Sequence, residues 1–275
     1  MPALSPETEH VVIDDCSIAL YDIRTGNRPP AVFLHGIGCS KAVWSRVLGR
    51  LPEQWRLIAY DSRGAGESKE SSPGPLSLDL YASDLRAVLH ARGAEDRPVL
   101  VGHSLGASVA LQFALTWPDV PAALVLIGAE AGLCRLGAMM QERASAIAAS
   151  GMRGWIEGPW RKAPPFSPAS RAAEPGLVDT YAQMLYQTGA ERYARAVTAI
   201  AESPDLTGLV GRIELPVLVL IGGDDDRTLP SFGWQLAEQL PNGRGVELPN
   251  IGHTLPMESP GRVAEELITF IGANS

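Results

Sequence analysis

Short apolar runs alternate with longer amphipathic segments along most of the 275-residue chain. Apolar runs bounded by glycine, proline and charged residues are typical of strands that are buried on both faces of a sheet. We therefore predict strands at residues 9–13, 17–23, 31–35, 56–60, 98–101, 122–127, 217–221 and 245–248. The amphipathic segments predict intervening helices at residues 42–51, 80–91, 107–117, 231–240 and 261–270.

This alternation predicts an α/β fold with a mostly parallel, eight-stranded sheet and helices on both faces. The pattern changes between residues 129 and 204, where it is helical, interrupted by glycine and proline, and without a clear strand. We therefore predict a core formed by residues 1–128 and 205–275, with a helical insertion at 129–204 after the sixth strand.

The strongest chemical signal is Gly102-His103-Ser104-Leu105-Gly106, which lies between a predicted strand and a predicted helix. A G-x-S-x-G sequence in this position places its serine on a sharp turn and exposes the hydroxyl at the carboxyl end of the strand. The flanking glycines let the strand and helix backbones come close. Ser104 is thus a candidate nucleophile, and the alternative is a glycine-rich turn with an incidental serine.

A serine nucleophile needs a base within hydrogen-bond reach and a group that orients that base. Gly252-His253 follows the last predicted strand, so His253 lies in a loop at the end of the sheet and is the candidate base. Three adjacent acids, Asp224 to Asp226, follow the strand at 217–221. We expect His35 and His103 to have structural roles.

Five motifs in this order resemble those of the α/β-hydrolase superfamily, and the resemblance extends over about residues 10–272. The motifs are His35-Gly36-Ile37-Gly38, the D-x-R-G-x-G-x-S sequence at 61–68, G-x-S-x-G at 102–106, the acid loop at 223–230, and Gly252-His253. The resemblance implies a Ser104–His253–Asp226 triad. It also implies that the backbone N–H groups of Ile37 and Leu105 form an oxyanion hole.

The identity of the acid depends on spacing. The family pattern G-x-x-D-x-x-x-P matches Gly223, Asp226 and Pro230, so we predict Asp226 as the triad acid and the two preceding aspartates as a solvated loop. Glu130 is a competitor because it follows the predicted strand at 122–127, a position from which some relatives take their acid.

The resemblance further implies that residues 129–204 form a helical cap, named the cap segment below. A cap covers the nucleophile, excludes water and shapes the substrate pocket. The cap segment carries eight Lys/Arg and seven Asp/Glu, against fifteen and twenty-four in the rest of the chain. This difference favours an anionic substrate, or it reflects solvated helix faces of little energetic consequence.

Within the serine-dependent branch, the chain is most similar to small bacterial esterases and 3-oxoadipate enol-lactonases. The similarity implies hydrolysis of a carboxylic ester or lactone of a small, largely apolar molecule through an acyl-enzyme, with no metal and no cofactor. Three alternatives on the same triad are a carbon–carbon bond hydrolase, a cofactor-free perhydrolase or haloperoxidase, and a slow-turnover small-molecule receptor.

Composition narrows the expected partners. The net charge of −8 provides no electrostatic support for nucleic-acid binding. No apolar run approaches the roughly 18 residues of a membrane span, and no apolar leader is visible. The three widely spaced cysteines, Cys16, Cys39 and Cys134, fit a reducing compartment better than a disulfide framework or a zinc site. We expect a cytoplasmic enzyme with a small-molecule substrate.

Overall fold

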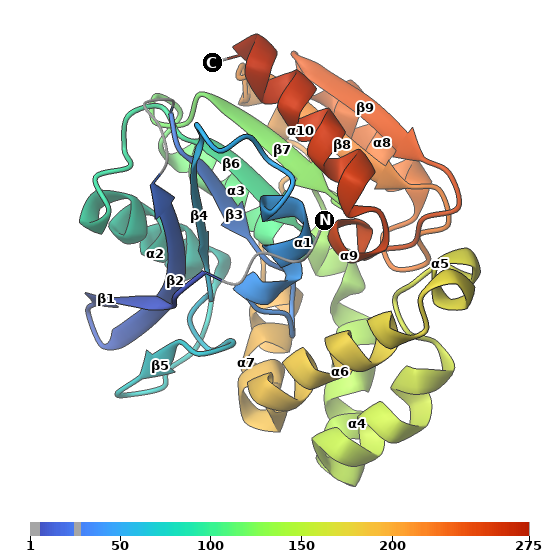
Figure 1. Cartoon of the computed structure of the whole chain (residues 1–275). Helices are drawn as coiled ribbons and strands as arrows, with labels where there is room; N and C mark the ends of the chain where they lie inside the picture. Colours follow the sequence, from blue (N-terminus) through green and yellow to red (C-terminus); the bar gives the residue numbers. More distant parts are fainter. Residues whose placement is uncertain (1–5, 25–28, 275) are drawn as a thin grey trace.

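The structure is a computed structural model that describes residues 6–24 and 29–274, and it is built around one twisted sheet (Figure 1). The strand order is β1-β2-β4-β3-β6-β7-β8-β9, with β5 paired to β2. The strands are β1 (Glu9–Ile13), β2 (Cys16–Arg24), β3 (Ala31–Leu34), β4 (Arg56–Tyr60), β5 (Lys69–Glu70), β6 (Val99–His103), β7 (Ala123–Ile127), β8 (Val217–Gly222) and β9 (Gly243–Leu248).

The predicted α/β fold and its eight strands are confirmed, and β5 is an additional strand. Two residues are too few to produce a recognisable hydrophobic pattern, so the sequence could not predict β5. Strands β4, β3, β6, β7, β8 and β9 pair in parallel, whereas β1 pairs antiparallel with β2, and β2 with β4. All residues of β6, β7 and β8 are buried, as their continuous apolar sequences predict.

Helices cover both faces of the sheet (Figure 1). One face carries α2 (Leu78–Ala91), α3 (Leu105–Thr116) and α8 (Pro230–Gln239), and the other carries α1 (Ser45–Leu48) and α10 (Pro260–Asn274). The predicted helix at 42–51 is instead a 3-10 turn, η1 (Lys41–Trp44), followed by the short α1. The remaining core elements are η4 (Val210–Arg212) and α9 (Leu255–Glu258).

The parallel register brings the ends of the central strands to one edge. Leu34 of β3 pairs with Gly102 of β6, which pairs with Leu126 of β7. Gly222 at the end of β8 pairs with Leu248 at the end of β9. The loops that follow these five strands therefore emerge together, as ligand-binding loops do in parallel α/β sheets.

The cap segment leaves the core after β7, returns before β8, and lies at this edge of the sheet (Figure 1). Its residues, all of which the structure describes, form helices and loops without a strand. The elements are η2 (Leu133–Leu136), α4 (Gly137–Trp155), the π-helical turn η3 (Ile156–Trp160), α5 (Pro168–Ala173), α6 (Gly176–Thr188) and α7 (Ala190–Ala201). Non-helical backbone at Gly151 and Gly158 bends the first part of the segment.

Among the described residues, none of the helices combines the length and the apolar character that crossing a bilayer would require.

Candidate active site

Ser104 occupies a strained turn between β6 and α3. Its φ of 53° and ψ of −118° lie outside the regions that a residue with a Cβ ordinarily adopts. The glycines on either side are required by close backbone contacts. A Cβ on Gly102 would lie 2.4 Å from the carbonyl oxygen of Gly106, and a Cβ on Gly106 would lie 2.3 Å from that of Leu34. The G-x-S-x-G pattern therefore has a steric basis in this chain.

His253 lies in the loop after β9, and one carboxylate holds that loop in place. Glu258 accepts hydrogen bonds from the backbone N–H groups of Gly252 (2.9 Å) and Thr254 (3.0 Å), which flank His253. It also accepts one from Ser167 N in the cap segment (2.9 Å). A Cβ at Gly252 would lie 2.5 Å from Ser167 N, which explains the glycine before the histidine.

The acid beside His253 is Asp225, so the predicted Asp226 is wrong. His253 Nδ1 lies 2.8 Å from Asp225 Oδ2, and Asp225 is only 3% exposed. The Asp226 side chain is 64% exposed and lies 3.4 Å from Arg227 Nε. The error has a simple cause, because the loop from the acid to Pro230 contains one residue more than the family pattern.

The surroundings of Asp225 favour its ionised form. The backbone N–H groups of Arg227 and Thr228 donate to Asp225 Oδ1 at 2.8 and 2.9 Å. Burial acts to raise the pKa of Asp225, but the charge of His253 and these hydrogen bonds lower the pKa below its ordinary value. The carboxylate can therefore hold the imidazole orientation and stabilise its cation.

Glu130, the competing acid, is buried at the exit of β7 and makes no hydrogen bond within the described part of the chain. Burial raises its pKa to about 7. Asp225, and not Glu130, is the carboxylate that hydrogen-bonds His253.

Two other histidines hold the site together. His103 Nε2 lies 2.9 Å from the carbonyl oxygen of His253, and burial lowers the pKa of His103 to about 3, so it stays neutral and donates this hydrogen bond. His35 Nε2 accepts from Ser62 N at 3.0 Å, while its Nδ1 lies 2.8 Å from the Gly36 carbonyl oxygen. Both contacts agree with the structural roles expected of these residues.

The predicted oxyanion-hole residues, Ile37 and Leu105, are in the turns next to Ser104. Leu105 is the first residue of α3, so its N–H has no partner within the helix. Ile37 follows β3 in a turn closed by a hydrogen bond from Cys39 N to the Gly36 carbonyl oxygen (3.2 Å). Both Ile37 and Leu105 are buried.

The motif at 61–68 stabilises the chain next to this turn through hydrogen bonds and an ion pair. The fully buried Asp61 accepts from Lys41 N (2.6 Å), Lys41 Nζ (3.0 Å) and Glu67 N (2.8 Å). Gly66 has a φ of 49°, and a Cβ there would lie 2.2 Å from Asp61 Oδ2. Arg63 makes a bidentate pair with Asp84, with both distances 2.9 Å. The role of this motif is structural, because it fixes the chain that follows the predicted oxyanion-hole turn.

Ser104 and His253 line one cavity of about 190 Å³ between the core and the cap segment. The core also contributes Gly36, Ile37, His103, Arg227 and Thr228. The cap segment contributes Leu136, Met139, Met140, Arg143, Trp155, Pro159, Trp160, Ala163, Pro165, Tyr181, Leu185 and Tyr193. The sequence predicted a cap but could not identify these residues, since the apolar faces of its helices also pack against the core. No group of three or more metal-ligating side chains occurs among residues 6–24 and 29–274.

Comparisons with known proteins identify similar proteins and solved structures of the same fold. A protein from Klebsiella pneumoniae named as a carbamate hydrolase, RutD, is 30% identical over 227 residues, covering 82% of this chain and 84% of the relative. A thermophilic esterase from Thermogutta terrifontis superposes with a TM-score of 0.87 at 26% identity, covering 98% of this chain and 100% of that one.

An enol-lactonase from Burkholderia xenovorans has the same fold, with a TM-score of 0.87 at 22% identity over 96% of this chain and 100% of that one. Residues 31–266, which include most of the core and all of the cap segment, match the alpha/beta hydrolase family. Together with the elbow at Ser104 and the ordered loops around it, this match shows that the chain belongs to the alpha/beta hydrolase family.

Proposed function

We propose that this hydrolase cleaves a carboxylic ester or lactone of a small molecule through an acyl-enzyme formed on Ser104. The observation that carries the proposal is the shared cavity, in which a serine on a strained elbow and a histidine paired with a buried aspartate face the same space. Esterase and lactonase relatives support the choice of bond.

In the proposed mechanism, His253 takes the proton of Ser104 as the hydroxyl oxygen attacks the substrate carbonyl carbon. Asp225 orients the imidazole and stabilises the cation that forms. The N–H groups of Ile37 and Leu105 donate to the developing oxyanion, and one such donor is worth about 2.7–4 kcal/mol. His253 then returns the proton to the leaving group, and water attacks the acyl-enzyme by the same route.

The test is hydrolysis of 4-nitrophenyl acetate, butyrate and octanoate by the wild type and by Ser104→Ala. Removal of the nucleophile is expected to lower kcat on the order of 10⁶-fold. The dependence on acyl length then measures the depth of the pocket. A Ser104→Ala protein that folds and retains turnover would exclude the mechanism.

A carbamate is the second candidate substrate, because the Klebsiella relative carries that assignment in its name. The chemistry differs only in the group attached to the carbonyl carbon. To separate carbamate from ester hydrolysis, phenol release is measured with phenyl carbamate and with phenyl acetate. A higher kcat/KM for the carbamate would favour this candidate over an ester or lactone.

A further inference from the structure

Among the described residues, the Asp, Glu, Lys and Arg side chains that line the cavity are two cations, Arg143 and Arg227, and no aspartate or glutamate. The chain as a whole carries a net charge of −8, so this local excess of positive charge is opposite to the general composition. The other lining side chains are mainly aliphatic, aromatic or sulfur-containing. Because such surroundings have a low dielectric constant, they strengthen the attraction between a cation and an anion.

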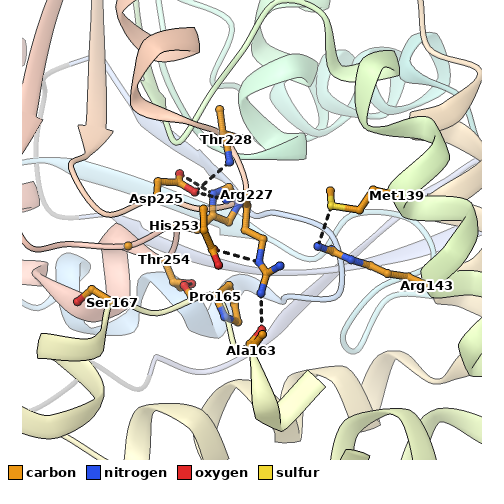
Figure 2. Close-up of polar contacts among 12 residues, drawn as sticks. Met139, Arg143, Ala163, Pro165, Ser167, Asp225, Arg227, Thr228, His253 and Thr254 are labelled. Atoms are coloured by element: carbon orange, nitrogen blue, oxygen red, sulfur yellow. Dashed lines mark hydrogen bonds and ion pairs between the residues drawn. The ribbon is translucent and has the colours of Figure 1, made fainter. Parts of the chain in front are cut away.

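Arg143 extends from α4 toward the side of the site where Arg227 and His253 lie (Figure 2). Its guanidinium nitrogens lie 3.5 Å from Met139 Sδ and 3.8 Å from Met140 Sδ, and thioethers are weak acceptors. The neighbouring Tyr193 hydroxyl is neutral, since burial raises its pKa although Arg143 partly opposes this effect. Within the described residues, no carboxylate lies within 4 Å of the Arg143 side chain. A half-buried guanidinium with five donors therefore has only weak or neutral partners.

Arg227 differs because its guanidinium has two oxygen partners. Its Nη2 donates to the carbonyl oxygen of Ala163 in the cap segment (Figure 2). Its Nε lies 3.4 Å from Asp226 Oδ1. Arg227 thus connects the acid loop to the cap segment. It adds positive charge to the cavity, whereas Arg143 is the cation that lacks a strong acceptor among the described residues.

We propose that the substrate carries a carboxylate that pairs with Arg143, separated by an apolar span from the carbonyl that Ser104 attacks. This inference rests on the proposed function and names its substrate class. An arginine pairs with a carboxylate through two charge-assisted hydrogen bonds. A carboxylate buried in an apolar cavity without such a cationic partner would lose much of its solvation energy. The carboxylate belongs either to the acyl part or to the leaving group, and the test separates these two cases.

The experiment uses two pairs of esters that differ only in charge. For the acyl part, the pair is 4-nitrophenyl hydrogen adipate and methyl 4-nitrophenyl adipate. For the leaving group, the pair is 4-acetoxybenzoate and methyl 4-acetoxybenzoate. Arg143→Met is expected to lower kcat/KM for one anionic ester by about ten- to a hundredfold, mainly through KM, and to change its neutral partner by less than about twofold.

Two further variants serve as controls. Arg143→Lys keeps the charge but loses the bidentate geometry, so we expect an intermediate loss for the same anionic ester. Arg153→Met removes an exposed arginine of the same helix that stacks on Tyr186 and does not line the cavity, so the preference for the anion should be unchanged. Equal losses for both members of each ester pair in Arg143→Met would overturn the proposal.

A binding measurement keeps this test separate from the test of the mechanism. If the wild type hydrolyses none of these esters, the open-chain ester form of the proposed function fails, and calorimetry with succinate, glutarate and adipate then tests the carboxylate site directly. At least one of the three should bind Arg143→Met at least about tenfold more weakly than the wild type. Absence of binding to the wild type, or equal binding to both proteins, would overturn the inference.

Discussion

The core side of the cavity is held by close backbone contacts at a sheet edge, whereas the cap side is held by side-chain packing between helices. On the core side, Ser104 N donates to the Ile127 carbonyl oxygen at 2.9 Å, and Gly102 contacts Gly106 through its backbone. On the cap side, Trp160 stacks on Tyr181 with ring centroids 5.7 Å apart. Backbone contacts of this kind tolerate no added atom, while packed side chains can be exchanged for others of similar volume.

This difference separates two requirements of a hydrolase. The proposed reacting groups lie on loops fixed by strands, so the proposed chemistry depends on the part that sequence variation can change least. The cap-segment groups expected to meet the rest of the substrate lie on helices interrupted by irregular turns, where substitution costs less stability. A shared fold can therefore serve different substrates, because the residues that meet the substrate are local to each chain.

The largest predicted effect tests the core side. Asp225→Asn should lower kcat by about 10⁴-fold, because an amide at this position stabilises the wrong tautomer of His253. Asp226→Asn is the matched control, and its kcat should stay within about twofold of the wild type since the Asp226 side chain is 64% exposed. A larger loss in Asp226→Asn than in Asp225→Asn would contradict the assignment of the acid.

A pair of glycine substitutions compares the two regions directly. Gly106 and Gly176 both lie in the first turn of a helix, α3 in the core and α6 in the cap segment. A Cβ at Gly106 would lie 2.3 Å from the Leu34 carbonyl oxygen, whereas a Cβ at Gly176 would meet nothing within 4 Å. Gly106→Ala should lower the free energy of unfolding by about 3 kcal/mol, and Gly176→Ala should raise it by about 0.5 kcal/mol.

Urea denaturation of the two alanine variants and the wild type gives both values. A Gly106→Ala protein as stable as the wild type would show that the core edge is less constrained than its backbone contacts imply.

A pH-dependent effect is predicted for Glu130, where the chain leaves the core for the cap segment. Its carboxyl has an ordinary pKa of 4.5 when unfolded and a pKa of about 7 when folded. Between these values the folded protein binds the additional proton, so ionisation of Glu130 lowers the free energy of unfolding as the pH rises to about 7. The free energy of unfolding of Glu130→Gln, relative to that of the wild type, should therefore rise by about 1–3 kcal/mol between pH 5 and pH 8.

The measurement is urea denaturation of both proteins at the two pH values. At each pH, the free energy of unfolding of the wild type is subtracted from that of Glu130→Gln, which removes the contribution of other titrating groups. A constant difference at pH 5 and pH 8 would mean that the folded Glu130 carboxyl ionises at its ordinary pKa.

The predictable parts of the molecule are those determined by local pattern. The sequence of β7 is apolar throughout because both of its faces are covered, and G-x-S-x-G follows from backbone contacts around Ser104. These features require particular residue types at particular positions. The α/β fold and the elbow were therefore predictable from the chain alone.

The remaining features depend on contacts between distant segments. Asp225 and Asp226 are chemically identical in the sequence, and the fold of their loop against His253 decides which one is buried. Arg143 is likewise one of several cap-segment arginines. Its place in the cavity depends on which face of α4 packs against α7, and no local spacing reports that choice.

The contacts of Glu258 also have a consequence for motion. By binding Ser167 together with Gly252 and Thr254, this carboxylate ties the loop of the proposed base to the second half of the cap segment. The Thr254 hydroxyl adds a second tie to the carbonyl oxygen of Pro165 at 2.9 Å. Opening the whole cap would displace His253, so substrate entry is expected to use a hinge in the first half, near Gly151 and Gly158. Insertions designed to admit larger substrates are best placed there, ahead of residue 165.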